Sequence, residues 1–382
     1  MRIPLAVGLC LIAITAVAAP RAKDQAKPDA NVAAGQNLRE NFRARINENV
    51  VTIMAGSPSG TDLAIVQDLA SVLDDGDRLR VLPMVGKGPE QNVKDVMFLR
   101  GVDMGVTQAN LLKHFDKTGE LGPNLKGQIA YIAKLFNEEL HILVRPEVND
   151  IRELNGKYVN FGAQGSGAEI TGQLIFAALG VDTQEVHLSD ADAIQKLKDG
   201  DIDATIVMTG KPAPVIAALE DKSGLKLLPV PYAQGLEDEY YPATFTHDDY
   251  PGLIPAGGRV DTMSVCAVLV SFNWPTDSVR YAKIAKFVDR FFSNFDAFLA
   301  TPRHPKWREV NFAATLEGWK RSPLSQRWID RAKAAATDSA SRGHFDAFLA
   351  QASGSRTTPI SDAERADLFK AFLEWNRGRN QN

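Results

Sequence analysis

Two glycine-rich turns carry the residues of this chain best suited to hold a small charged ligand. They read Gly-Ser-Pro-Ser-Gly-Thr at residues 56–61 and Gly-Ala-Gln-Gly-Ser-Gly at residues 162–167. The first N–H groups of a helix have no partner within the helix, and the helix dipole makes that end positive. A turn of this kind at the start of a helix therefore predicts a site for a carboxylate or another anion. The same residues also fit a glycine turn with a serine cap and no ligand.

The elements around both turns follow one plan. An apolar run typical of a strand precedes each turn, and apolar residues at helical spacing follow it over 63–73 and 170–179. Each unit then has a helix that ends at glycine and aspartate, followed by a short strand, at residues 98–106 and 197–207. Two α/β lobes built on one plan predict a cleft between them, where small ligands commonly bind.

The sequence lacks motifs for catalysis, cofactors and metals. Neither turn reads Gly-x-Ser-x-Gly, and no complete dinucleotide or phosphate-binding motif occurs. The six histidines are scattered, and His247, Asp248 and Asp249 form a cluster without metal-ligand spacing. Glu138 and Glu139 are adjacent, and in a strand they point to opposite faces, which makes them a poor acid–base pair. We therefore expect no enzyme, no catalytic residue, no cofactor and no metal.

Residues 1–18 have the features of a secretory signal peptide. Arg2 precedes an apolar core at residues 5–17, and Ala-Val-Ala at residues 16–18 is a small-residue cleavage site. The apolar run is short for a membrane span, so an uncleaved anchor fits less well. Cleavage would remove Cys10 and leave Cys266 as a single buried cysteine without an internal disulfide. We expect a periplasmic protein, and its net charge of −4 argues against a nucleic-acid partner.

The remaining chain predicts further elements in order. Residues 19–49 read as a polar leader and one helix, and residues 235–258 read as a long ordered loop whose Tyr240, Tyr241 and Tyr250 could face a ligand. Residues 260–270 are β-prone and predict a strand that returns to the first lobe. Residues 280–300 have an apolar stripe at helical spacing and predict a core helix. Residues 302–382, rich in Trp, Arg and Pro, predict a helical C-terminal extension.

An ordered series of short motifs resembles the extracytoplasmic solute receptors of TRAP transporters, TAXI subfamily. The motifs lie at residues 54–61, 88–92, 101–109, 135–141, 154–162, 165–167, 199–204 and 210–212. The resemblance implies an α/β, two-lobe, periplasmic-binding-protein-like (type II) fold, with lobe one at 50–146 plus 262–301 and lobe two at 147–261. It also implies a small organic anion, a dicarboxylate or an amino acid, as ligand and a TRAP-type membrane permease as partner. The chain departs from the family pattern at Asp62, Pro89 and Ala168.

The binding hypothesis places residues from both lobes around the ligand. Helix N-termini would hold its carboxylate, while hydroxyls and amides would fix its orientation. The predicted ligand-binding residues are Ser57, Ser59, Gly60, Thr61, Asn92 and Gln108 from lobe one and Gln164, Gly165, Ser166, Gly167, Ala168 and Thr209 from lobe two. Lys87, Arg145 and Lys211 are the candidate counter-charges.

Two other classes of function stay open at this point. The chain could be a periplasmic ligand sensor or assembly protein that signals to a membrane partner without transport, since its C-terminal region is rich in Trp and Arg. An enzyme on the same two-lobe architecture is less favoured, because the sequence shows no convergent set of His, Cys or carboxylate residues.

Overall fold

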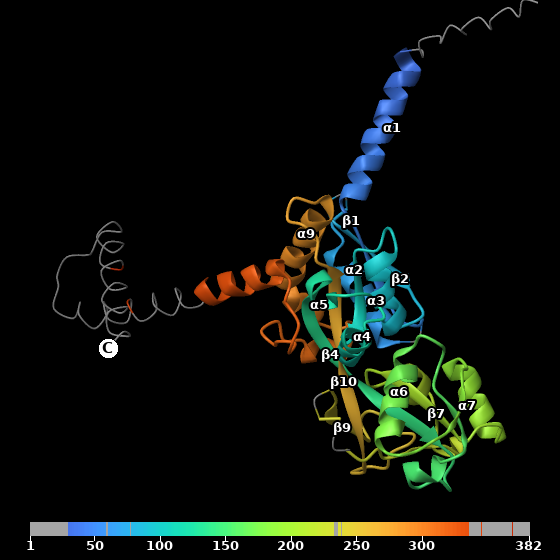
Figure 1. Ribbon diagram of the computed structural model, residues 1–382. Coiled ribbons are helices and arrows are strands. Elements are labelled where there is room, and N and C mark those ends of the chain that lie inside the picture. Colours follow the sequence, from blue (N-terminus) through green and yellow to red (C-terminus); the bar gives the residue numbers. More distant parts are fainter. Residues whose placement is uncertain are drawn as a thin grey trace, which may run out of the picture. The chain divides into compact units, whose positions relative to one another are not determined.

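The computed structural model describes residues 30–58, 60–76, 78–232, 236–237, 239–335, 345 and 369 (Figure 1). The predicted signal peptide, Ser59 and most of the predicted C-terminal extension beyond residue 335 lie outside these residues. The chain divides into two units, Met1–Ile46 and Asn47–Asn382, which are described separately. The helix predicted within residues 19–49 forms as α1 (Ala30–Glu48).

Ten strands in the described part of the second unit form one mixed sheet. Their order is β2-β1-β3-β10-β4-β7-β5-β6, with β8 paired to β4 and β9 paired to β10. The strands are β1 (Val50–Ala55), β2 (Arg80–Val85), β3 (Met104–Gln108), β4 (Ile129–Val144), β5 (Tyr158–Asn160), β6 (Gln184–Val186), β7 (Ala204–Thr209), β8 (Lys226–Leu227), β9 (Tyr241–Thr246) and β10 (Arg259–Phe272).

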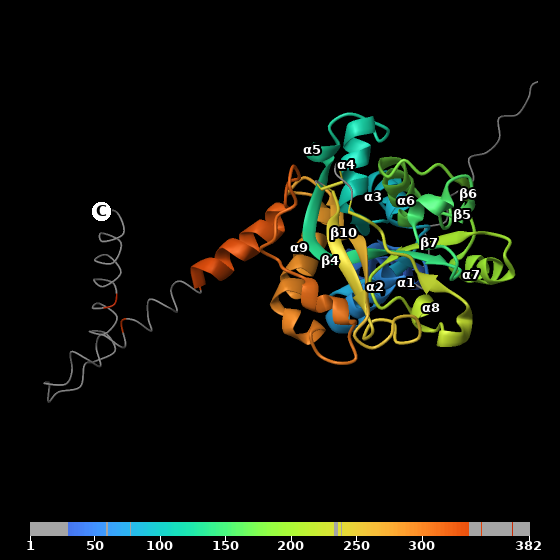
Figure 2. The ribbon, with the colours of Figure 1, turned by 90° about the horizontal axis from the view of Figure 1, so that it is seen from below.

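Helices cover this sheet in two groups, which define the two lobes (Figures 1 and 2). The first group is α2 (Thr61–Leu73), α3 (Pro89–Phe98), α4 (Ala109–Thr118), α5 (Leu125–Gln128) and α9 (Val279–Ser293). The second group is α6 (Gly167–Ala178), α7 (Asp190–Asp199) and α8 (Pro214–Ala217). Short 3-10 helices are η1 (Ile151–Leu154), η2 (Asp221–Ser223), η3 (Phe295–Phe298) and η4 (Pro305–Glu309).

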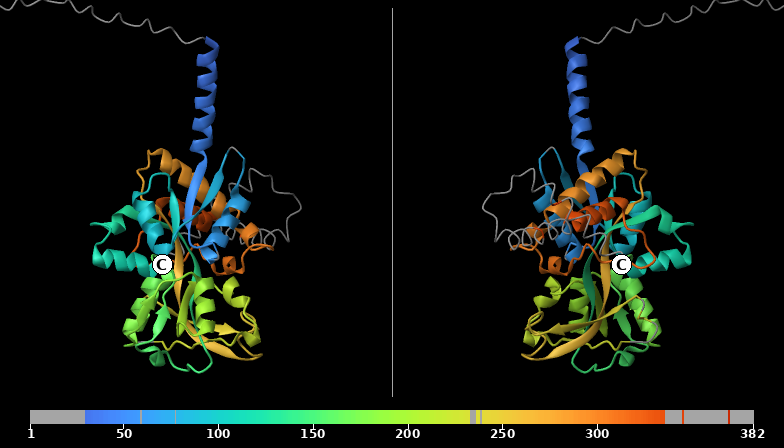
Figure 3. Two further views of the ribbon diagram at one scale, coloured as in Figure 1. Left: turned by 90° about the vertical axis from the view of Figure 1, so that its right-hand side faces the viewer. Right: turned by 90° about the vertical axis from the view of Figure 1, so that its left-hand side faces the viewer.

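Two long antiparallel strands, β4 and β10, run through both lobes (Figure 3). Residues 129–139 of β4 pair with β10, and residues 139–144 pair with β7 of the second lobe. The sequence has two apolar runs here, at residues 131–135 and 140–144, and the chain joins them in one strand of 16 residues. This architecture confirms the predicted fold class, an α/β protein of the type II periplasmic-binding-protein kind. The exact lobe boundaries at 146/147 and 261/262 stay predictions.

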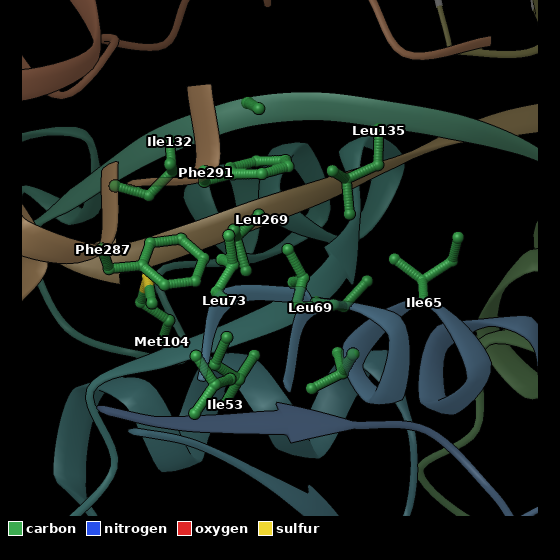
Figure 4. Packing of buried hydrophobic residues seen from close by; sticks show 14 of the residues in the cluster. Ile53, Ile65, Leu69, Leu73, Met104, Ile132, Leu135, Leu269, Phe287 and Phe291 are labelled. Carbon is green, nitrogen blue, oxygen red and sulfur yellow. The ribbon is translucent and has the colours of Figure 1, made fainter. Parts of the chain in front are cut away.

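The core of the first lobe lies between its sheet, α2 and α9. Leu69 and Leu73 of α2 face Phe287 and Phe291 of α9 across strand residues such as Leu269 (Figure 4). The predicted helix at 280–300 therefore packs in the core, as expected, but α9 ends at Ser293 and η3 follows. Burial of such apolar side chains is the main source of the lobe's stability.

The first part of the C-terminal extension belongs to the same core. Trp307 is fully buried, its ring lies 5.8 Å from that of Phe291, and its Nε1 donates to Asp68 of α2 at 2.9 Å. Residues 323–335 are helical, and Ser322 N donates to Tyr131 O of β4 at 2.8 Å. The predicted extension thus packs on the first lobe within residues 305–335.

The segment predicted as a long loop, residues 235–258, contains strand β9, so that prediction was wrong in part. β9 pairs with β10 from Tyr241 to Thr246. Tyr240 and Tyr250 are buried rather than turned to a ligand: Tyr240 accepts from Asn110, and Tyr250 bonds to His141 Nε2 at 2.6 Å. Cys266 is buried, as expected. Among the described helices, none has the length and apolar character needed to span a membrane.

Candidate functional site between the lobes

A cavity of about 380 Å³ lies between the two lobes. Both predicted glycine-rich turns contribute to its lining, together with Glu138 in the interior of β4, the end of β7 and the start of α7. Seven of the residues predicted from sequence line it: Ser57, Gly60, Lys87, Ser166, Gly167, Ala168 and Thr209. The structure therefore brings together two turns that are about 100 residues apart in the sequence, at a size typical of small-ligand sites (about 300–1,000 Å³).

Direct hydrogen bonds close the lobes on each other beside the cavity. Thr61 N donates to Thr209 Oγ1 at 3.2 Å, and Thr209 Oγ1 donates to Thr61 Oγ1 at 3.1 Å. Thr61 Oγ1 in turn donates to Gly210 O at 3.1 Å. The N-terminal N–H of α2 is therefore bound by the other lobe instead of being left for a ligand, which differs from the role predicted for Thr61.

The lobes also touch at Gly88, the residue that precedes α3. A Cβ atom at Gly88 would lie 2.9 Å from both Gly165 O and Ser166 Cα of the other lobe. The φ angle of Gly88 is +146°, which side chains rarely adopt. Only glycine fits this position when the lobes are closed.

The start of α6 forms the wall of the cavity in the second lobe. Ser166 lines the cavity, but its hydroxyl also caps α6, since it accepts from Glu169 N at 3.4 Å. Gly165 N donates to the Glu169 carboxylate at 2.7 Å. Gly167 and Ala168, the first two residues of α6, line the cavity, and within the described residues their N–H groups have no hydrogen-bond partner. These two N–H groups are available to donate hydrogen bonds to an anion.

Three carboxylates line the cavity: Asp62, Glu138 and Asp190. Asp62 and Glu138 are each 3% exposed, and burial raises the pKa of Asp62 to about 7. Burial and then the nearby Asp62 raise the pKa of Glu138 well above its ordinary value, and burial also raises the pKa of Asp190. The one basic residue in the lining is Lys87, whose side chain is exposed. The interior of the cavity is therefore acidic.

Gln108 holds Glu138 in place from behind the cavity. Its Nε2 donates to Glu138 Oε2 at 2.6 Å, and its Oε1 accepts from Thr171 Oγ1 of α6 at 3.3 Å. A Cβ atom at Gly167 would lie 2.3 Å from this Nε2. Gln108, predicted as a ligand-binding residue, thus lies outside the lining, where it bridges the lobes and orients the Glu138 carboxylate.

Glu139 points away from Glu138, as expected for neighbours in a strand. Its Oε1 accepts from Lys306 Nζ at 2.6 Å, and its Oε2 accepts from Lys211 N at 2.8 Å. Lys306 is 2% exposed and also pairs with Glu309 at 2.7 Å. The predicted poor acid–base pair within 138–139 is thus correct, but Glu138 instead approaches Asp62 of α2.

The other predicted residues lie elsewhere. Asn92 is fully buried and donates to Val106 O at 2.8 Å, and Gln164 and Gly165 line a second hollow outside the cavity. Arg145 binds Ile202 O at 2.7 Å and pairs with Asp203, while Lys211 pairs with Asp249 at 3.0 Å. Their charges are used within the second lobe, so the structure does not bring Arg145 and Lys211 to the cavity.

Sequence reasoning missed the acidic character of the site. From the sequence alone, Asp62 is a departure from the family pattern and Glu138 is half of an unsuitable acid–base pair, and neither observation gives the charge of the cavity. The signal available was their position: Asp62 follows the first glycine-rich turn, and Glu138 sits at the polar interruption between two apolar runs of β4. Within the described residues, no group of three or more His, Cys, Asp or Glu is placed to hold a metal.

Two α/β lobes with a cavity between them are the architecture of the type II periplasmic-binding-protein fold. A family model described as the NMT1-like family matches residues 53–288, and the chain belongs to this family.

Similar solved structures include one described as a periplasmic transporter, with TM-score 0.45 and 13% identity over 75% of this chain and 93% of that chain. Another is the alkanesulfonate-binding protein SsuA from Xanthomonas axonopodis pv. citri bound to MOPS, with TM-score 0.41 and 17% identity over 67% and 76% of the two chains. A third is the amino acid ABC transporter substrate-binding protein AbpA from Streptococcus pneumoniae bound to L-arginine, with TM-score 0.42 and 9% identity over 70% and 98%. These similarities concern the fold alone.

Proposed function

We propose that this chain is a periplasmic solute receptor that closes its lobes around one small organic molecule and delivers it to a TRAP-type membrane permease. The observation that carries the proposal is the cavity of about 380 Å³ lined by the glycine-rich turns of both lobes. The motif series that resembles TAXI-subfamily receptors supports the permease as partner. The signal-peptide features of residues 1–18 support the periplasm as location.

Among the small organic anions predicted as ligands, the lining favours an amino acid over a dicarboxylate. One carboxylate of the ligand has donors at the start of α6, where Gly167 and Ala168 line the cavity and their N–H groups have no partner within the described residues, and Lys87 lies on the rim. A second carboxylate would lie among Asp62, Glu138 and Asp190, where like charges repel in a medium of low dielectric constant. A ligand with one carboxylate and one amino group avoids this repulsion.

Lobe closure is the motion this function needs. β4 and β10 connect the lobes, and the bonds between Thr61 and Thr209 hold them together beside the cavity. Breaking these few contacts would open the cavity, while the cores of both lobes would remain intact.

A thermal-shift screen of amino acids and dicarboxylates, followed by calorimetry of the best ligand, tests the binding function. We expect an amino acid to raise the melting temperature and to be recovered unchanged by mass spectrometry. Gln108→Ala should weaken binding because it releases Glu138, and Ser166→Ala should weaken it less. A best ligand that binds equally to both variants and the native chain contradicts the site, and the absence of any ligand contradicts the receptor function.

Uptake by the permease is tested in vesicles that carry a reconstituted TRAP permease. Radiolabelled ligand should enter only when the receptor is added. Tight binding without uptake would favour the second class of function, a periplasmic sensor that signals to a membrane partner.

A further inference from the structure

Asp62 and Glu138 line the cavity, and within the described residues their carboxylates receive few hydrogen bonds. Asp62 belongs to the first turn of α2 and is 3% exposed, and its Oδ1 has no hydrogen-bond partner within the described residues. Leaving a buried charged oxygen unpaired is costly, so such an atom points to a partner that arrives from outside. Glu138 comes from β4 and receives one hydrogen bond, from Gln108 at 2.6 Å.

Within the described residues, neither carboxylate forms an ion pair with a basic side chain. The buried cation behind them, Lys306, is committed to Glu139 and Glu309 at 2.6 and 2.7 Å. Lys87 faces the cavity from its exposed rim, and Asp190 adds a further carboxylate from α7. The surrounding basic groups therefore do not neutralise Asp62 and Glu138, and we call these two residues the acidic end of the cavity.

We propose that Asp62 and Glu138 form the binding site for a positively charged group of the ligand, an ammonium in the simplest case. The inference rests on the proposed function, since it names the chemistry of the ligand in the same cavity. An ammonium donates three hydrogen bonds, and it can serve Asp62 Oδ1 and a free oxygen of Glu138 together. The site thereby selects amino-group-bearing ligands over neutral or doubly anionic ones.

Binding at this site displaces a proton. Burial raises the pKa of both carboxyls, to about 7 for Asp62, and the nearby Asp62 raises that of Glu138 further, so the empty cavity near pH 6 to 7 retains a proton. When the ammonium enters, it replaces that proton, which leaves to solvent. The total charge of the pair together with its bound cation or proton stays unchanged.

The test compares each amino acid that binds with its 2-hydroxy acid, in which a neutral hydroxyl replaces the ammonium. We expect the hydroxy acid to bind at least roughly tenfold more weakly, because it leaves buried carboxylates unpaired. Asp62→Asn should weaken the amino acid by at least roughly tenfold and change the affinity for the hydroxy acid little. Calorimetry near pH 6.5 in two buffers of different ionisation enthalpy should show proton release for the native chain and a smaller release for Asp62→Asn, in which only the buried Glu138 carboxyl remains.

Asp277→Asn is the matched control, since it removes one exposed carboxylate of the first lobe and should leave affinity and proton release unchanged. Glu138→Gln repeats the test from β4, and the comparison of the two ligands on the native chain requires no variant to fold. A hydroxy acid or dicarboxylate that binds as tightly as the amino acid overturns the inference and leaves the receptor function standing. If no member of these classes binds, both the inference and the receptor function fail.

Discussion

Glu138 and Glu139 are neighbours on β4, yet the two faces of this strand treat a buried carboxylate in opposite ways. Glu139 is bound on both oxygens, by the buried ammonium of Lys306 and by the N–H of Lys211. Glu138 lines the cavity, and among charged groups another carboxylate, Asp62, has the largest effect on its pKa. On one face of the strand the buried carboxylate has a cation as partner without any ligand, and on the other face it has none. An incomplete electrostatic arrangement in a cavity is a stronger indication of binding than a carboxylate as such.

The largest effect is expected from Lys306→Met, which would make Glu139 resemble Glu138. The buried Glu139 loses its cation, and breaking a buried ion pair costs about 3–5 kcal/mol of unfolding free energy. Denaturant unfolding at pH 8 measures this loss. The loss should shrink towards pH 5, because burial raises the pKa of Glu139 and an unpaired carboxyl is then protonated. Arg308→Met, which removes an exposed cation two residues away, should have almost no effect.

Asp62→Asn tests the other face through the pH dependence of stability. The pKa of Asp62 rises from 3.8 to about 7 on folding, so the folded chain holds a proton that the unfolded chain has lost. The unfolding free energy of the native, unliganded chain should therefore fall as pH rises from about 4 to 7, on the order of 2–4 kcal/mol.

In the Asp62→Asn variant the contribution of Asp62 to this fall should be absent, so that the variant is more stable than the native chain at pH 8 and similar at pH 4, while Glu138 and Glu139 keep their own contributions. Unfolding curves at these two pH values measure the difference, and Asp277→Asn serves as the control. Equal stabilities of the variant and the native chain at pH 8 would show that Asp62 is not strained by its surroundings.

Gly88→Ala tests whether closure keeps water from the acidic face. Its Cβ would collide with Gly165 O and Ser166 Cα, so the lobes could not close fully. Ligand affinity should fall by about tenfold or more. The fall of stability between pH 4 and 7 should also become shallower, since water would then reach Asp62 and Glu138.

Gly101→Ala is the matched control, because Gly101 also has a positive φ, +92°, but a Cβ there meets nothing within 4 Å. Calorimetry and unfolding curves on both variants separate backbone strain from the collision between lobes. An equal loss of affinity in the two variants would mean that closure at Gly88 is unimportant.

The smallest effect is expected from Ser166→Ala. It removes the cap of α6, which typically costs about 1 kcal/mol, and touches neither Asp62 nor Glu138. Thermal unfolding should show this loss with the pH dependence unchanged. A change in the pH dependence would instead mean that Ser166 affects the protonation of Asp62 or Glu138.

Sequence patterns predicted most of the fold because they are local. The strand-turn-helix units at both glycine-rich turns, the return strand β10 and the core helix α9 each follow from hydrophobic spacing within one segment. The fusion of two apolar runs into β4 could not be predicted, because the polar residues 137–139 between them read as a break. They are polar since β4 passes there between the two lobes.

The site was only partly predictable for a different reason. Glycine and serine at helix starts are local signals, and they led to Ser57, Gly60 and Gly167 in the cavity lining. The charge of the cavity depends on which ionic groups are already paired, and that is decided by distant segments. Arg145 and Lys211 form ion pairs with Asp203 and Asp249. Lys306, which lies 168 positions beyond Glu138 in the sequence, pairs with Glu139.

The Glu139–Lys306 pair also fixes where the chain can be shortened. A protein that ends at residue 301, the boundary suggested by composition, would keep Glu139 in β4. It would lose Lys306, the cation that pairs with Glu139, and the buried indole of Trp307. If this shortened protein lost its function, the cause could be damage to β4, the strand that connects the lobes, and the experiment would say nothing about a role of the C-terminal extension in binding a membrane partner. A cut after residue 335 spares both, so that shorter deletion is the one that can reveal a separate task for the C-terminal end.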